Sequence, residues 1–310
     1  MGLNATDREK SKKMLFTGLA NSGKTSINLA LKRNMSEIGL VKPTYLIDRS
    51  IFKYLDYEII QHDLGGQQKY LISYLREPGR YFSETDAIIF VIDILDPALY
   101  AEAIAYYKEV LERLHTLDIT PGIWVFFHKA EAIVFNKDEI QLRMVERLKT
   151  EIKHINAQRF MLNFNITTIF DHWSIANAFG RIMNVLYSQS KFLSELLRSL
   201  ADDVNASIIA IIDDNLVPVT SHVNDPRQER LIGYTVPYLY RLITTMPPSS
   251  NHNGLISMEH GEYGFAFMKL PNAPISLFIL IIGTKETTKQ ELIQKITEYS
   301  PKLLYALLSK

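Results

Sequence analysis

The chain begins with apolar strand-like runs that alternate with stretches of helical periodicity. The strand-like runs cover residues 13–17, 54–62, 87–94, 122–127 and 160–167. Apolar residues at helical spacing cover residues 26–33, 101–114, 137–154 and 174–188. This alternation predicts an α/β fold with a doubly wound, mostly parallel sheet. Such sheets bind ligands at the C-terminal ends of their strands, so we expect the chemistry in the loops that follow them.

The pattern changes after about residue 189. We expect a helix over residues 190–204, a hairpin over 207–213 and 217–223, and a long helical stretch over 225–246. Three more strands are expected over 254–260, 263–269 and 275–283, and a last helix over 288–308. Gly233 and Pro237 predict a kink or a break within the long helical stretch. The order αββαβββα predicts a second, α+β domain with an antiparallel sheet. Because it carries no phosphate loop and no clustered catalytic residues, we expect it to serve assembly.

The first loop of the α/β part matches a phosphate-binding motif at every fixed position. Residues 18–25 read GLANSGKT and fit G-x-x-x-x-G-K-[ST] between a strand and a helix start. Backbone N–H groups there face an anion, Lys24 reaches the outer phosphates, and the Thr25 hydroxyl ligates Mg²⁺. A glycine-containing turn is the alternative. We expect a nucleoside triphosphate to contact Gly18, Asn21, Ser22, Gly23, Lys24, Thr25 and Ser26.

A second loop, with the sequence DLGGQ, follows the strand that ends at His62. In the arrangement D-x-x-G-Q, Asp63 holds Mg²⁺ through water, the Gly66 N–H meets the γ-phosphate, and Gln67 orients the attacking water. The alternative is a polar turn with two glycines.

Thr44 follows Pro43 about twenty residues after the phosphate loop. If its segment folds inward, its hydroxyl ligates Mg²⁺ and its N–H meets the γ-phosphate. A threonine after proline is otherwise typical of a turn. We therefore expect Lys24, Thr44 and Gln67 to carry catalysis, and Thr25, Thr44 and Asp63 to hold the metal.

The order of these loops resembles that of small Ras-like GTPases, and the details resemble the Rag/Gtr branch. They are the paired glycines of DLGGQ, a base loop His128-Lys129-Ala130-Glu131, and the run TTIFD over residues 167–171, which is similar to T-S-I-W-D. Members of that family carry a C-terminal roadblock- or longin-like αββαβββα domain for dimerisation. The resemblance implies a leader over 1–12, a Ras-like GTPase domain over 13–188 and a roadblock-type domain over 189–310.

The resemblance implies that His128, Lys129, Glu131, Thr168 and Ile169 contact the nucleotide. His128 stands where other Ras-like GTPases have asparagine, and it is expected to brace the loops. The aliphatic stem of Lys129 is expected to lie along the base. Glu131 stands where family members usually have aspartate, which accepts hydrogen bonds from guanine. Glutamate is one methylene longer, so either it retracts or the base shifts. Adenine would present an acceptor to this carboxylate, so we expect guanine to be preferred.

Other residues have simpler expected roles. Asp93 and Asp96 are expected to cap the next helix rather than to touch metal. Arg49, Arg76 and Arg80 could each supply an arginine to the site in cis, but a solvated or partner-facing position is the stronger expectation. Helical spacing predicts core or dimer-face packing for Tyr234, Tyr238 and Tyr240.

Composition narrows the expected partners and compartment. With 34 basic and 34 acidic residues, the chain has no overall charge that favours nucleic acid. The absence of cysteine excludes disulfides and thiolate chemistry, which suits the cytoplasm. No apolar run reaches the length of a membrane span. The start MGLNAT fits a loose myristoylation pattern at Gly2, with a mobile polar leader as the alternative. We expect a cytoplasmic protein, peripheral to a membrane surface at most through partners.

These features predict a guanine-nucleotide switch that binds GTP or GDP with Mg²⁺ and hydrolyses GTP slowly without an activating partner. The resemblance implies a homodimer or a heterodimer with a related GTPase, and roadblock-type scaffolds and GTPase-activating proteins as further partners. One alternative is a scaffold subunit that binds nucleotide without hydrolysing it. Another is an Arf-type trafficking GTPase, which rests mainly on Gly2 and which the long C-terminal domain disfavours.

Overall fold

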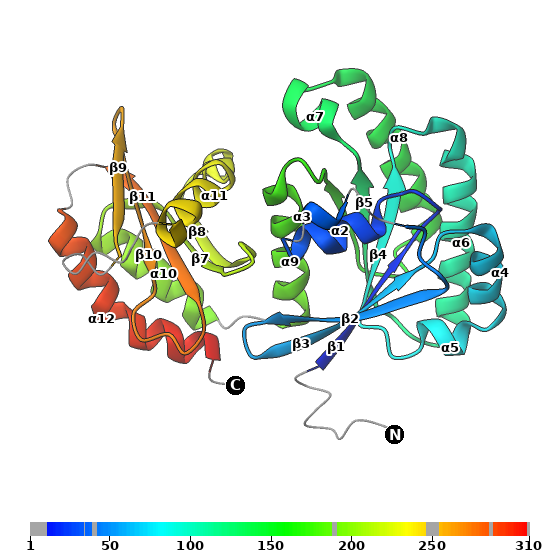
Figure 1. The fold of residues 1–310 in the computed structure, drawn as a ribbon, viewed down its shortest axis with the longest axis horizontal. Coiled ribbons are helices and arrows are strands. Elements are labelled where there is room, and N and C mark those ends of the chain that lie inside the picture. The colour runs from blue at the N-terminus through cyan, green and yellow to red at the C-terminus, as the bar shows by residue number, and fades with distance from the viewer. Residues whose placement is uncertain are drawn as a thin grey trace. The chain divides into compact units, whose positions relative to one another are not determined.

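The computed structural model describes residues 11–33, 35–38, 42–187, 191–245, 254–284 and 288–308 (Figure 1). The chain forms two compact units that divide between Ala178 and Phe179, inside helix α9 (His172–Leu186). The expected boundary at residue 188 lies just after this helix. The leader over residues 1–12, including Gly2, falls almost entirely outside the described residues.

The N-terminal unit is built on a six-stranded sheet of order β2-β3-β1-β4-β5-β6. The strands are β1 (Ser11–Thr17), β2 (Ile47–Tyr54), β3 (Tyr57–Leu64), β4 (Ala87–Asp93), β5 (Gly122–His128) and β6 (Leu162–Ile166). All neighbours pair in parallel except β2 and β3, which are antiparallel. This confirms the predicted doubly wound, mostly parallel sheet.

Helices cover both faces of this sheet. They are α2 (Lys24–Leu31), α3 (Met35–Ile38), α4 (Gln68–Arg76), α5 (Pro78–Phe82), α6 (Tyr100–Thr116), α7 (Glu131–Asn136), α8 (Glu139–Asn156) and α9, with a 3-10 turn η1 (Pro97–Leu99). Helices α4, α6 and α8 lie on one face, and α2 and α9 lie on the other (Figure 1). Fully buried Leu15, Phe90 and Val125 on the central strands form the core with residues of α4, α6 and α8. The N-termini of α2 and α4 lie close to the strand ends that carry the predicted loops.

The single strand predicted over residues 54–62 is wrong. Tyr54 ends β2 and pairs with Tyr57, the first residue of β3. Leu55 between them has φ +52°, the left-handed conformation that a tight hairpin turn uses. The pattern hid β2 because it is an edge strand, in which polar residues such as Asp48 and Arg49 face solvent.

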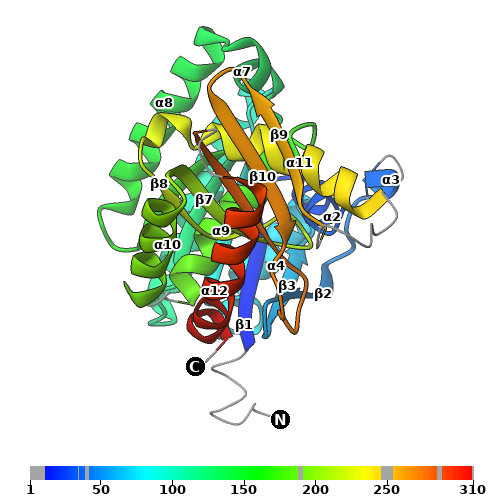
Figure 2. The ribbon, with the colours of Figure 1, turned by 90° about the vertical axis from the view of Figure 1, so that its left-hand side faces the viewer.

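Over its described residues, the C-terminal unit is built on a five-stranded antiparallel sheet of order β8-β7-β11-β10-β9, with helices packed on it. Its elements are α10 (Lys191–Asp203), β7 (Ala206–Asp213), β8 (Pro218–Val223), α11 (Arg230–Thr245), β9 (Ile256–His260), β10 (Tyr263–Lys269), β11 (Leu277–Thr284) and α12 (Lys289–Leu308). Helices α10 and α12 lie on one face of the sheet and α11 on the other (Figure 2). This confirms the predicted αββαβββα order.

Of the kink or break predicted at Gly233 and Pro237, the break does not occur. A short 3-10 turn, η2 (Pro226–Gln228), precedes α11, which then runs through both residues as one helix. Pro237 lacks one backbone donor, but the buried side chains of Ile232, Val236 and Leu239 hold the helix on the sheet. Among the described helices, none combines the length and the apolarity that a membrane span requires.

Candidate functional site

The phosphate-loop residues join β1 to α2 with a backbone that only glycine fits at two positions. Gly18 has φ +138°, and Gly23, the residue that caps α2, has φ +96°. A Cβ on Gly18 would lie 2.3 Å from the Val91 carbonyl oxygen. A Cβ on Gly23 would lie 2.4 Å from the His128 ring. Angle and space therefore both require glycine, and the loop wraps the start of α2 closely.

Lys24 places a buried cation at the centre of this loop. Its Nζ donates to the carbonyl oxygens of Gly18 (3.0 Å) and Leu19 (2.7 Å), and to Ser22 Oγ at 3.4 Å. Burial lowers the pKa of Lys24 to about 8, while the negative charge of Asp63 acts in the opposite direction and raises it. The ammonium thus stays largely protonated near neutral pH, beside the N-terminus of α2. Ser22 is buried, Ser26 is half-buried and Asn21 is exposed.

Three oxygen-bearing side chains meet next to Lys24. Thr25 Oγ1 donates to Asp63 Oδ2 at 2.6 Å and lies 3.0 Å from Thr44 Oγ1. The second carboxylate oxygen, Asp63 Oδ1, is buried and has no hydrogen-bond partner among the described residues. Burial raises the pKa of Asp63, while the Thr25 hydrogen bond and the Lys24 charge oppose that shift. Hydroxyl and carboxylate oxygens are the ligands that Mg²⁺ takes, so this set with its unpartnered oxygen fits that ion.

The described residues hold no cluster of three or more histidine, cysteine, aspartate or glutamate side chains that could bind a metal. A site with one carboxylate and two hydroxyls, as at Thr25, Thr44 and Asp63, is of a different kind. It resembles the Mg²⁺ sites completed by substrate phosphates rather than an all-protein cage.

Gly66 lies against the phosphate loop, and Gln67 follows it at the start of α4. A Cβ on Gly66 would lie 2.4 Å from the Leu19 carbonyl and from the Ala20 nitrogen, so the two backbones are in direct contact. Gln67 caps α4, and its carbonyl accepts the amides of Tyr70 (2.8 Å) and Leu71 (3.1 Å). Its side chain is half-buried. Gly66 thus lies beside the loop that carries Lys24, and Gln67 is the next residue along the chain.

His128 joins the base loop to its neighbours. Its ring packs against Gly23, and its Nδ1 shares a 3.0 Å hydrogen bond with Thr167 Oγ1. Burial, helped by the Lys129 charge, lowers its pKa to about 4. The ring is therefore neutral at neutral pH and touches both the phosphate loop and the loop after β6. Sequence reasoning gave Thr167 no role, although it begins the TTIFD run.

Lys129 pairs with Asp93 across adjacent strand ends. Its Nζ lies 2.5 Å from Asp93 Oδ2, and Asp93 Oδ1 accepts the Leu95 amide at 2.9 Å. The register explains the pair, because Asp93 is aligned with His128. The expectation that Asp93 caps the next helix is wrong. Asp96 does occupy the N-cap position of η1, but its side chain makes no capping hydrogen bond.

Glu131 begins α7 and reaches the loop after β6. Its Oε1 accepts the Thr168 hydroxyl at 2.6 Å. Thr168 is fully buried, and its amide donates to Ser174 Oγ at 3.1 Å. The next residue, Ile169, is half-buried. This arrangement fixes one oxygen of the longer carboxylate and leaves Oε2 for another donor.

The three arginines considered for the site are exposed. Arg49 lies on the edge strand β2, and Arg76 ends α4. Arg80 pairs with Glu77 at 3.2 Å. No contact of any of them with the phosphate-loop residues occurs in the described structure.

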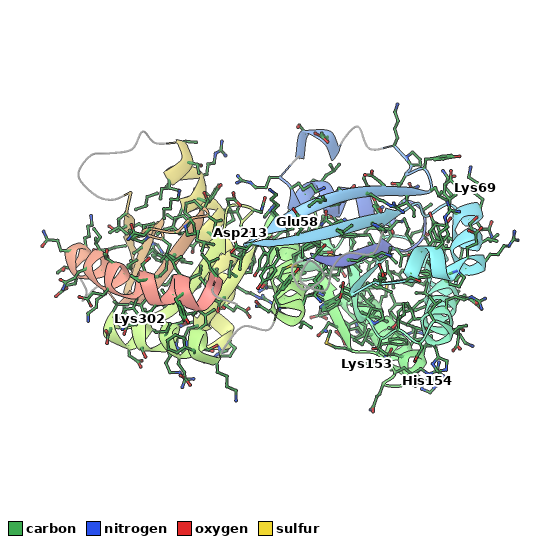
Figure 3. The ribbon with its side chains drawn as sticks, turned by 90° about the horizontal axis from the view of Figure 1, so that it is seen from below. Glu58, Lys69, Lys153, His154, Asp213 and Lys302 are labelled. Carbon is green, nitrogen blue, oxygen red and sulfur yellow. The ribbon has the colours of Figure 1, made fainter. Side chains whose placement is uncertain are left out.

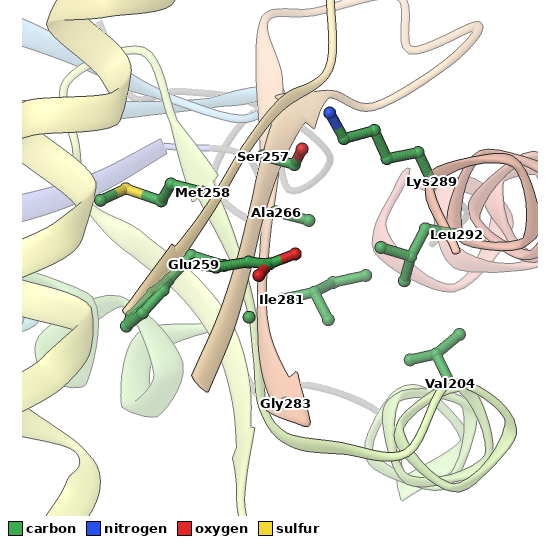
Figure 4. Close-up of a pocket in the computed structure, with 11 residues that line it drawn as sticks. Val204, Ser257, Met258, Glu259, Ala266, Ile281, Gly283, Lys289 and Leu292 are labelled. Carbon is green, nitrogen blue, oxygen red and sulfur yellow. The ribbon is translucent and has the colours of Figure 1, made fainter. Parts of the chain in front are cut away.

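The C-terminal unit has a hollow of its own between the sheet and helices α10 and α12 (Figure 4). Its walls combine apolar Val204, Ala266 and Leu292 with the charged residues Glu259 and Lys289. The convergent polar chemistry of the described chain lies in the N-terminal unit.

The lowered pKa of His128 makes a testable contribution to stability. The unfolded chain binds this proton near pH 6.5 and the folded chain only near 4, so the contribution is full above pH 6.5 and is lost as the pH falls toward 4. The parent should lose unfolding free energy when the pH is lowered from about 7.5 to about 5.5. We expect this loss to be about 1–2 kcal/mol smaller in His128→Asn, measured by urea denaturation at both pH values.

The same substitution at the exposed His115 is the control and should keep the pH dependence of the parent. Burial also lowers the pKa values of His62 and His172 to about 4, but they are present in parent and variants alike. Equal acid sensitivity of His128→Asn and the parent would contradict this account.

The similarity of the chain to known proteins agrees with the assignment of the loops described above. Residues 13–237 match the Gtr1/RagA G protein conserved region. The chain is 29% identical to GTP-binding protein gtr2 of Schizosaccharomyces pombe over 227 residues, which is 69% of this chain and 70% of that protein. It is also 29% identical to GTP-binding protein GTR2 of Saccharomyces cerevisiae over 234 residues, which is 71% of this chain and 66% of that protein.

A solved structure of the Arl6 BBS3 small GTPase from Trypanosoma brucei, with the nucleotide analogue GppNp, aligns with a TM-score of 0.45 and 17% identity. It covers 58% of this chain and 99% of that one. The conserved-region match extends over well more than half of the chain and includes every loop described above. The chain therefore belongs to the Gtr1/RagA family of G proteins.

Proposed function

We propose that the chain is a molecular switch that binds GTP or GDP with Mg²⁺ and hydrolyses GTP slowly. The observation that carries this proposal is the meeting of Thr25, Thr44 and Asp63 beside the buried ammonium of Lys24. These residues come from three separate segments of the chain. Their meeting provides the charge and the oxygen ligands that a nucleotide–metal complex requires.

In this proposal Lys24 and the amides at the start of α2 hold the β- and γ-phosphates. The hydroxyls of Thr25 and Thr44 would ligate Mg²⁺ directly, and Asp63 would hold it through water. When bound, the ion neutralises charge that develops on the phosphates. Gln67 follows Gly66, which contacts the phosphate loop, and in this proposal its side chain orients the attacking water.

Guanine recognition is assigned to Glu131. Its Oε1 is occupied by Thr168, and its Oε2 can accept from the guanine edge. In this proposal the Thr168 hydroxyl holds the longer side chain so that Oε2 faces the base. Lys129, held by Asp93, offers its stem to the base. The names of both yeast relatives, GTP-binding proteins, support this choice of base.

We further propose that the part from 189 to 310 dimerises, with a second copy or with a related GTPase. Tyr234 and Tyr238 on α11 are 73% and 77% exposed and lie four residues apart, so they share one helix face. Tyr240 instead is buried and packs edge-to-face on Phe278 at 5.0 Å. Two exposed tyrosines on one face are typical of an interface. Roadblock-type scaffolds and GTPase-activating proteins are the further partners that this proposal implies.

The hydrolysis proposal predicts a specific loss at Gln67. We expect Gln67→Leu to slow single-turnover GTP hydrolysis at least about tenfold, since a tenfold change in rate corresponds to about 1.4 kcal/mol of transition-state stabilisation. GTP affinity should stay close to that of the parent, because the phosphate loop is unchanged. Phosphate release from the full chain preloaded with GTP measures this.

The adjacent Gln68→Leu is the control, because Gln68 is exposed at the first turn of α4. It should hydrolyse GTP at the rate of the parent. Hydrolysis by Gln67→Leu at that same rate, or none by the parent, would favour the alternative of a non-hydrolysing scaffold subunit.

The dimer proposal predicts that Tyr234→Arg with Tyr238→Arg shifts the full chain toward monomer. Charges placed in the buried core of an interface are costly, so we expect the dissociation constant to rise at least about tenfold. Tyr305→Arg on α12, 69% exposed, is the matched control and should leave the dimer intact. Sedimentation velocity distinguishes these outcomes. A parent chain that sediments as a monomer at high concentration, alone and with a related GTPase, argues against dimerisation.

A further inference from the structure

The segments that carry Thr44 and Gln67 are tied to each other through one backbone carbonyl. The Leu46 oxygen accepts the Gly65 amide at 2.8 Å and also accepts the hydroxyl of Tyr74 on α4. Two donors use both lone pairs of this carbonyl. Leu46 itself is held at φ +56°, a conformation that is uncommon for leucine and that surrounding contacts must maintain.

Close packing reinforces these hydrogen bonds. A Cβ on Gly65 would lie 2.5 Å from the Thr44 carbonyl oxygen, so the two backbones meet without a side chain between them. Tyr45 and Tyr70 stack edge-to-face with ring centroids 5.7 Å apart. Lys69, at the surface in Figure 3, places its Nζ 4.7 Å from the centre of the Tyr70 ring. The Gly65–Thr44 and Tyr45–Tyr70 contacts join residues 44–46 to residues 65–74, and Lys69 adds a contact within the second segment.

The side chain of Tyr74, which donates to the Leu46 carbonyl, is fixed by its surroundings. It is fully buried, and its ring meets Tyr81 edge-to-face with centroids 4.7 Å apart. Burial raises the pKa of Tyr74, so the hydroxyl keeps its proton over the physiological range. Thr44 lies two residues before the shared carbonyl, and Asp63 and Gln67 each lie two residues from Gly65. The hydrogen bonds to the Leu46 carbonyl therefore lie between the residues assigned to the metal and the residue assigned to the attacking water.

We propose that Tyr74 and Gly65 form a clasp on the Leu46 carbonyl that makes the two segments move as one unit. This inference rests on the proposed switch function. When a γ-phosphate holds either segment, the clasp holds the other, and loss of the phosphate releases both together. Tyr74 touches neither nucleotide nor metal in this arrangement, so it is a positioning residue for Thr44.

The test compares Tyr74→Phe with Tyr107→Phe in the full chain. Tyr74→Phe keeps the ring and removes only the donor to Leu46. Tyr107 is a matched control, because it is buried on α6 and its hydroxyl has no hydrogen-bond partner within the described structure. Gly65→Ala is an independent disruption, since its Cβ would meet the Thr44 carbonyl while the Tyr74 hydroxyl stays in place.

The first readout needs no nucleotide. Hydrogen–deuterium exchange of the peptide spanning residues 42–47, in nucleotide-free protein, should accelerate about fivefold in Tyr74→Phe, the size expected for one lost hydrogen bond. Gly65→Ala should accelerate it too, and Tyr107→Phe should match the parent. Unchanged exchange in Tyr74→Phe overturns the clasp, whether or not the parent binds GTP.

The second readout separates positioning from general stability. Tyr74→Phe should speed release of a non-hydrolysable GTP analogue with Mg²⁺ about fivefold and leave GDP release unchanged, because the γ-phosphate is the group that holds the Thr44 segment inward. Equal acceleration for both nucleotides overturns the positioning role. A parent that binds neither nucleotide overturns the proposed function, while the exchange experiment still decides the clasp.

Discussion

The hydrogen bond from Thr25 to Asp63 is the contact on which the whole site depends. It joins the first turn of α2 to the end of β3 at 2.6 Å. The parallel pairing of β1 with β3 makes it available, because Phe16 is aligned with Asp63 just before the phosphate loop begins. Once these two residues meet, Thr44 needs only to fold inward to complete the oxygen set.

Glycine residues allow the loops of the site to contact one another through their backbones. Gly23 lets the His128 ring lie on the phosphate loop, and Gly66 lets its own segment lie on Leu19 and Ala20. Gly65 does the same for Thr44. Each of these residues leaves room for a neighbouring group where a single methyl would intrude. The site is therefore assembled by backbone contact as much as by side-chain chemistry.

The residues that could be predicted from sequence are those set by local pattern. The phosphate loop, DLGGQ and the αββαβββα order each rest on short spacing or on regular apolar runs, and the structure brings Thr25, Thr44 and Asp63 together as that reasoning required. The edge strand β2 escaped prediction because solvent covers much of it and its pattern is polar.

Contacts between distant segments were not predictable in this way. Lys129 and Asp93 are 36 residues apart and meet only because β4 and β5 pair in register. Tyr74 reaches Leu46 over 28 residues and through α4, a helix that the sequence reading did not assign. The Thr168 contact of Glu131 likewise spans 37 residues. Such pairs follow from strand order and helix placement, which hydrophobic periodicity does not specify.

The central claim is that these loops select a guanine nucleotide together with Mg²⁺. The most direct measurement is equilibrium competition between GTP and ATP for the full chain, with Mg²⁺ present and then removed by chelation. The account predicts that GTP binds at least about 100-fold more tightly than ATP, because adenine leaves the Glu131 carboxylate facing an acceptor, and that chelation weakens GTP binding. Equal binding of GTP and ATP, or GTP binding that is indifferent to Mg²⁺, would contradict it.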